Sequence, residues 1–150
     1  MKKKDLEIIK KTAEKLLGML QIEGEVEVVE VEEGASVVLS TQESGIVIGH
    51  HGETLEALQL ILSLVTAKEL GEFVRIALEV GDYRKSREEY LRSLALSSKE
   101  KVISQGREVT LPMLKSWERR VVHLIFQDDK DVTSESVGEG RERVLVIKPR

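Results

Sequence analysis

The residues from Gly45 to Val65 constrain the fold of this chain more than any other stretch. A short apolar run, Ile46–Ile48, leads into a Gly-x-x-Gly turn at residues 49–52, and a helical pattern follows directly. Glycine adopts backbone angles that other residues avoid, and it has no side chain to keep a ligand away. The first N–H groups of the following helix are unpaired and point at the turn. The stretch therefore predicts either a turn that holds a phosphate backbone or a tight turn between two packed helices without a ligand.

Apolar periodicity predicts the elements around this turn. Four residues at helical spacing, Leu55, Leu58, Leu62 and Val65, predict a helix over residues 53–70 with one buried face, which ends at Gly71. Ser44 is the expected cap of a short helix that ends at Ile48. Further elements are a helix over residues 4–20, strands over 25–32 and 36–41 joined by a hairpin at 33–35, and a strand over 73–80. A bulge is expected at Val28-Val29, where the alternation slips.

This order predicts a mixed three-stranded sheet, because helices connect its second and third strands. The glutamates between Glu23 and Glu33 are interpreted as a solvated strand face, since their spacing matches no known metal site.

Composition and charge exclude several classes of protein. The 150-residue chain has no cysteine, which excludes a disulfide scaffold and a cysteine-based zinc site and fits a reducing cytosol. No apolar run approaches the length of a membrane span, and the start of the chain does not read as a signal peptide. Residues 1–82 carry 8 basic and 16 acidic residues, a net charge of −8, whereas residues 83–150 carry 15 and 11, a net charge of +4. A phosphate ligand should therefore be attracted mainly by the second half.

The second half reads as a separate module that begins after Gly81-Asp82, so we expect domains at residues 1–82 and 83–150. A long helix is predicted over 83–105, followed by a strand over 107–111 and a helix over 113–127 that Pro112 opens. Two strands are predicted around the turn at 138–140. The long helix has an apolar inner face made of Leu91, Leu94, Ala95, Ser98 and Val102. The next helix is expected to bury Leu114, Trp117, Val121, Leu124 and Ile125. The whole chain is thus an α+β protein of two small modules.

Arg119 and His123 lie four residues apart on the side of the second predicted helix that we expect to face solvent. An exposed guanidinium beside an imidazole can bind a phosphate or a base edge. The alternative is an ordinary polar helix face.

Both motifs resemble those of the Jag (SpoIIIJ-associated) family. The IVIG-HHG-ETLEALQ stretch resembles a type II KH domain, and ERRVVHLIFQDD followed by SESVGEG resembles the R-three-H domain, named for its Arg-x-x-x-His motif. The resemblance implies that Gly49, His50, His51 and Gly52 bind RNA, and that Arg119 and His123 bind nucleic acid in the second module. From their charge and expected proximity we add Arg120, Lys115 and Arg141 to the second site.

The resemblance implies a non-catalytic protein of the bacterial cytoplasm that binds single-stranded RNA, or single-stranded DNA, without cofactor or metal. It also implies a post-transcriptional role in cell elongation and envelope growth, and partnership with a smaller KH protein. A protein-interaction scaffold is the alternative, because His50 and His51 stand where the family usually has a lysine or arginine. An enzyme is disfavoured, because the sequence has no nucleophile motif, no phosphate-binding lysine motif and no third metal ligand near the histidine pair.

Overall fold

The computed structural model describes residues 1–150 and divides them into two compact units, residues 1–84 and 85–150. The first unit contains α1 (Lys3–Met19), β1 (Glu25–Val31), β2 (Gly34–Ser40), α2 (Ser44–Ile48), the 3-10 turn η1 (His50–Gly52), α3 (Glu53–Leu70) and β3 (Ile76–Val80). The order of these elements is the one that the sequence predicts.

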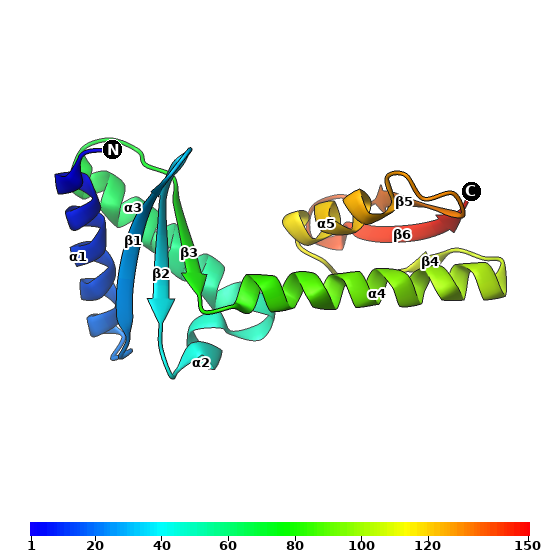
Figure 1. The fold of residues 1–150 in the computed structure, drawn as a ribbon, viewed down its shortest axis with the longest axis horizontal. Coiled ribbons are helices and arrows are strands. Elements are labelled where there is room, and N and C mark those ends of the chain that lie inside the picture. The colour runs from blue at the N-terminus through cyan, green and yellow to red at the C-terminus, as the bar shows by residue number, and fades with distance from the viewer. The chain divides into compact units, whose positions relative to one another are not determined.

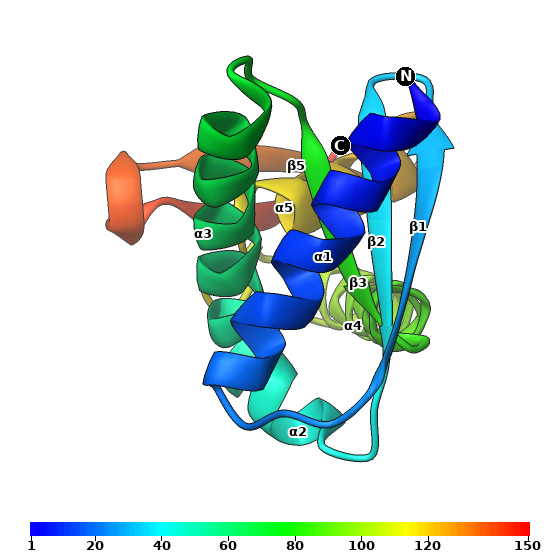
Figure 2. The same ribbon diagram turned by 90° about the vertical axis from the view of Figure 1, so that its left-hand side faces the viewer.

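The three strands of the first unit form a mixed sheet in the order β1-β2-β3. β1 pairs antiparallel with β2, and β2 pairs parallel with β3, as expected for strands joined by helices. Helices α1 and α3 lie side by side on one face of this sheet (Figures 1 and 2). The core between the helices and the sheet includes Ile9, Val37, Leu39, Val47 and Leu62, all essentially inaccessible to solvent.

The β1–β2 hairpin differs from the prediction in two details. The strands pair residue for residue from Glu25↔Ser40 to Val31↔Gly34, so there is no bulge at Val28-Val29, and the turn consists of Glu32 and Glu33. Because side chains alternate across a strand, Val28 packs toward the helices while Val29 is left 52% exposed on the other face. The break in the alternation of apolar and polar residues at Val28-Val29 is therefore due to the exposed valine Val29, and the strand has no bulge there.

Three details of the predictions for this unit are wrong. Glu43 occupies the N-cap position of α2, and Ser44 is already helical. β3 begins at Ile76, and Phe73 is largely exposed before it. The buried face of α3 is Leu58, Leu62 and Thr66, which stack four residues apart, so Val65 is rotated away from the core.

The second unit contains most of α4 (Tyr83–Gln105), then β4 (Val109–Thr110), α5 (Ser116–Phe126), β5 (Val132–Val137), the 3-10 turn η2 (Gly140–Glu142) and β6 (Val144–Pro149). Its strands form an antiparallel sheet in the order β4-β6-β5. The predicted inner face of α4 is confirmed, because Leu91, Ala95, Ser98 and Val102 are buried and Leu94 packs against the same core. None of the helices in either unit is long and apolar enough to cross a membrane.

The entry into α5 corrects the prediction that Pro112 opens this helix. Residues 111–115 have no regular secondary structure, with Leu111 and Leu114 buried, and α5 starts only at Ser116. The carboxylate of Glu118 accepts the backbone N–H of Lys115 at 2.9 Å, which caps the helix there. The buried stripe of α5 is Glu118, Val122 and Phe126, whereas Leu124 is 61% exposed. The predicted strand over 107–111 is reduced to the two residues that pair with β6.

Candidate nucleic-acid interface

The Gly-x-x-Gly turn joins α2 to α3 through backbone angles that ordinary residues avoid. Gly49 has φ 69° and ψ −170°, and Gly52 has φ 78° and ψ 14°. Between them, His51 also lies in the left-handed region, with φ 51°. Three of these four residues thus have positive φ, which turns the chain sharply from one helix into the next.

Each glycine is also required by a close neighbour. A Cβ atom on Gly49 would lie 2.1 Å from the hydroxyl oxygen of Thr54. A Cβ atom on Gly52 would lie 3.0 Å from the hydroxyl oxygen of Tyr83, at the start of α4. The missing side chains thus let Thr54 and Tyr83 pack against the backbone of the turn.

The N-terminus of α3 behind this turn has no side-chain cap. No side chain forms a capping hydrogen bond there, and His50 and His51 are both exposed, with their rings edge-to-face at 4.0 Å between centroids. The first N–H groups of a helix and its dipole favour an anion at such an end. Glu53 and Glu56 lie in the same turn and oppose that preference. Of the four predicted loop residues, His50 and His51 are thus exposed beside two carboxylates, whereas Gly52 is buried.

The imidazole of His123, in the second unit, points at strand β5. Its Nδ1 lies 2.6 Å from Oγ of Ser134, and its Nε2 lies 3.0 Å from Oγ of Ser136. The two serines are two residues apart, so they share the face of β5 that packs toward α5. Both ring nitrogens of His123 are therefore occupied within the protein.

Arg119 is likewise partly occupied. Its guanidinium donates to the backbone oxygen of Leu114 at 2.6 Å and to Oγ of Ser116 at 3.1 Å. Arg119 and His123, which were expected to face solvent, are thus half-buried, because both side chains fold back onto their own unit. In this arrangement Arg119 holds the segment that enters α5, and His123 ties α5 to β5.

The remaining residues predicted for the second site lie at different places in this unit. Lys115 is the N-cap residue of α5, Arg120 is exposed on the helix, and Arg141 is exposed in η2. Sequence reasoning missed Arg143, which lies near enough to His123 for its charge to lower the pKa of that imidazole. The alternation of Ser134 and Ser136 along β5 was the signal that two hydroxyls would face α5.

Burial lowers the pKa of His123 below its ordinary value of 6.5, and the charges of Arg143 and Arg119 lower it further. A histidine that is harder to protonate in the folded state stabilises the protein above pH 6.5, and this contribution is lost as the pH falls below that value. We therefore expect the second unit to lose stability between neutral pH and about pH 5.

Fluorescence of Trp117, the only tryptophan, reports on the unfolding of this unit. The variant His123→Gln should show a flatter dependence on pH, and NMR titration should find the imidazole pKa of His123 below 6.5. Equal stability at neutral pH and at about pH 5 would contradict the expected contribution of His123.

Comparison with known proteins identifies both units. The family model described as "KhpA/KhpB, KH domain" matches residues 7–78, and the model of the R-three-H domain matches residues 89–149. The fold and the two motifs thus define a protein with a KH domain followed by an R-three-H domain.

Curated relatives are similar to this chain over most of its length. The chain is 38% identical over 122 residues to "RNA-binding protein KhpB" of Clostridium symbiosum, covering 81% of this chain and 55% of that protein. It is 33% identical to the protein of the same name from Lactiplantibacillus plantarum, covering 77% and 36%, and 28% identical to that of Bacillus subtilis, covering 73% and 53%. The chain belongs to this KhpB, or Jag, family. It spans about a third to just over half of the length of these relatives.

Proposed function

We propose that this protein binds single-stranded RNA, or single-stranded DNA, through the loop Gly49–Gly52 and through a second surface around Arg119 and His123. The observation that carries the proposal is the N-terminus of α3, which no side-chain hydrogen bond caps, together with the exposed side chains of His50 and His51 in the turn before it. Main-chain donors there would hold the sugar-phosphate backbone of the strand. The name "RNA-binding protein KhpB" of the relatives supports the same ligand.

The variant His50→Asp, His51→Asp tests the first surface. Two carboxylates at the turn should repel the phosphates and weaken RNA binding by about tenfold or more at low salt. Both side chains are exposed, and asparagine and aspartate tolerate the left-handed angles of His51, so the fold should be unaffected. The matched variant His50→Asn, His51→Asn should bind with nearly unchanged affinity. Fluorescence anisotropy with a labelled single-stranded RNA pool at two salt concentrations measures both.

The second surface provides the alternative outcome of the same titration. If the aspartate variant still binds with full affinity, the RNA lies on the second unit, and Arg120→Ala should then reduce the affinity. Arg120 is the better probe because it is exposed, whereas Arg119 also bonds to the backbone of Leu114. If neither the parent protein nor the variants bind RNA, the proposed function is wrong.

We further propose that α3 docks on the KH domain of a second, smaller protein. Helix α3 exposes four large apolar residues on the side away from its own core: Leu60, Ile61, Leu64 and Val65, which are between 41% and 61% accessible. Such a contiguous apolar strip is typical of a protein interface. The family model that matches this unit covers two kinds of protein, KhpA and KhpB, which supports a related KH domain as the occupant.

Changing Leu60 and Leu64 to glutamate should abolish co-elution with the small KH protein from the same organism in size-exclusion chromatography. The residues are exposed, so the stability of the first unit should change by less than about 0.5 kcal/mol. The variant Lys68→Glu, on the last turn of the same helix, is the control and should still co-elute. An unaltered elution profile of the double variant would contradict this docking surface.

A protein-interaction scaffold without RNA binding is the second candidate. The exposed strip on α3 favours it, together with the acidic residues Glu53 and Glu56 at the helix end that would meet RNA. A scaffold should bind its partner equally well with the aspartate loop variant. Under both candidates we propose a non-catalytic role in the cytoplasm. We also carry over from the family resemblance the proposal of a post-transcriptional role in cell elongation and envelope growth.

A further inference from the structure

Strand β1 has a free pairing edge. It is the outermost strand of the first sheet, and only β2 pairs with it. In β2, the N–H of Ala35 donates to the backbone oxygen of Arg75, and the backbone oxygen of Leu39 accepts from Gly81, so the odd-numbered residues of β2 face β3. The even-numbered residues of β2 must then face β1, where they are opposite Glu25, Glu27, Val29 and Val31. The backbone groups of Val26, Val28 and Glu30 are therefore directed at the open edge.

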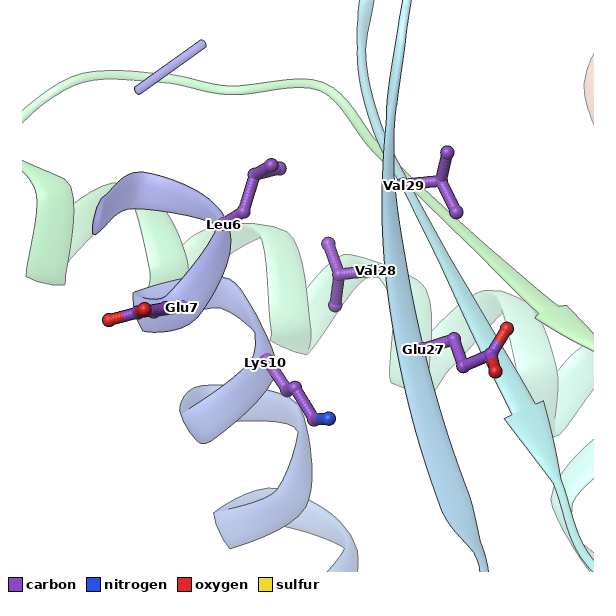
Figure 3. A pocket seen from close by; sticks show the side chains of 6 residues that line it. All are labelled: Leu6, Glu7, Lys10, Glu27, Val28 and Val29. Carbon is purple, nitrogen blue, oxygen red and sulfur yellow. The ribbon is translucent and has the colours of Figure 1, made fainter. Parts of the chain in front are cut away.

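A groove of about 380 Å³ runs beside this edge, between α1 and β1 (Figure 3). Its lining is Leu6, Glu7, Lys10, Glu27, Val28 and Val29. Leu6 and Val28 point into the space between helix and strand, whereas Glu27 and Val29 project from the other side of the strand. A chain laid along β1 would thus meet Leu6 and Val28, with Lys10 beside them, with one set of its alternating side chains, and the carboxylate of Glu27 with the other.

The edge lacks several of the features that normally keep a free strand from pairing, although three of its seven residues are charged. Monomeric proteins protect such edges with lysine, proline or a bulge. β1 has no proline and no lysine, it pairs with β2 without a bulge, and Val29 and Val31 are 52% and 45% exposed. Its only charges are the carboxylates of Glu25, Glu27 and Glu30. These charges repel acidic strands and attract basic ones.

We propose that the free edge of β1 binds an extended, lysine- or arginine-rich segment of a partner protein as a fourth strand of this sheet. The N–H and C=O groups of Val26, Val28 and Glu30 pair with the backbone of the added strand. Its basic side chains lie beside Glu25 and Glu27, and its alternate apolar side chains enter the groove at Leu6 and Val28. The edge strand and the Gly49–Gly52 loop are different elements, so this inference is independent of RNA binding.

The probe is a short fluorescein-labelled peptide of alternating lysine and valine, titrated into the full chain at low salt. We expect saturable binding, and no binding of the corresponding peptide of alternating glutamate and valine. Residue-resolved hydrogen exchange should show that the N–H groups of Val26, Val28 and Glu30 become protected when the peptide binds. This protection distinguishes strand addition from nonspecific attraction to an acidic surface, which would leave these amides unprotected.

Two pairs of variants complete the test. Glu25→Lys, Glu27→Lys should weaken binding by about tenfold or more, whereas Glu69→Lys, Glu72→Lys, with the same charge change on α3 and after it, should weaken it by less than about threefold. Glu30→Pro removes one outward donor and should weaken binding about tenfold relative to Glu30→Gln. Both Glu30 variants lose the ion pair with the Met1 ammonium group, so that loss does not account for a difference between them.

Absence of binding, equal losses in the two lysine variants, or binding without protection of the three amides would each overturn the proposal. Protection that appears without peptide and grows with protein concentration would also overturn it, because the occupant would then be a second copy of the chain.

Discussion

Replacement of Glu118 by alanine should destabilise the second unit by about 3 kcal/mol. The Glu118 side chain is only 1% exposed, and its Oε1 lies 2.6 Å from Nε of Arg87, which is itself 12% exposed. The other carboxylate oxygen, Oε2, accepts the N–H of Lys115. Truncation removes the carboxylate from a buried guanidinium and from the first turn of α5 together, and neither group gains full access to water.

Chemical denaturation monitored by Trp117 fluorescence measures this loss. Glu139→Ala, in the exposed turn before η2, is the control and should shift the free energy of unfolding by less than about 0.5 kcal/mol. The double variant Arg87→Met, Glu118→Leu should be more stable than Glu118→Ala, because apolar side chains of similar size need no ionic partner. A loss in Glu118→Ala as small as that of the control would show that the ion pair contributes little.

Replacement of Gly49 by alanine should destabilise the first unit by about 2–3 kcal/mol and weaken RNA binding with it. The backbone angles of Gly49 lie in a region that is nearly restricted to glycine. The new methyl group would also lie 2.1 Å from Oγ1 of Thr54 and 2.7 Å from its Cβ, so either the turn or α3 must move.

Two variants separate the effect of backbone strain at Gly49 from the effect of the close contact with Thr54. Gly45→Ala, four residues earlier in α2, meets no atom within 4 Å and should be neutral or slightly stabilising, because alanine favours a helix. Gly49→Ala, Thr54→Ala removes the contact with Oγ1 and should recover only part of the loss, because the backbone strain stays. Thermal unfolding followed by circular dichroism reports the change, with Trp117 fluorescence as the reference for the second unit. If Gly49→Ala were as stable as Gly45→Ala, the steric argument for this turn would be wrong.

The role of Gly49 could be predicted from the sequence, because a Gly-x-x-Gly motif between two apolar stretches indicates a sharp turn that needs glycine. The role of Glu118 could not be predicted from the sequence, because an acidic residue three positions into a helix normally faces water. Its partner Arg87 is also 31 residues away in the chain. The expected apolar face of α5 is confirmed for Trp117, Val121 and Ile125, which pack against the core, but Leu124 is exposed. The prediction also left out Glu118, the one carboxylate that the core accepts as half of an ion pair.

The sequence by itself determined the element order of both units, the mixed sheet, the position of the loop and the inner face of α4. These properties follow from periodicity, turn residues and chain connectivity, which act over a few neighbouring residues. Only the tertiary structure decided how the functional side chains are used. Arg119 and His123 share a helix face as their spacing required, but the segment before α5 and the hydroxyls of β5 hold them in place. The free edge of β1 is likewise a property of strand order, which depends on contacts between distant parts of the chain rather than on the residues of the strand alone.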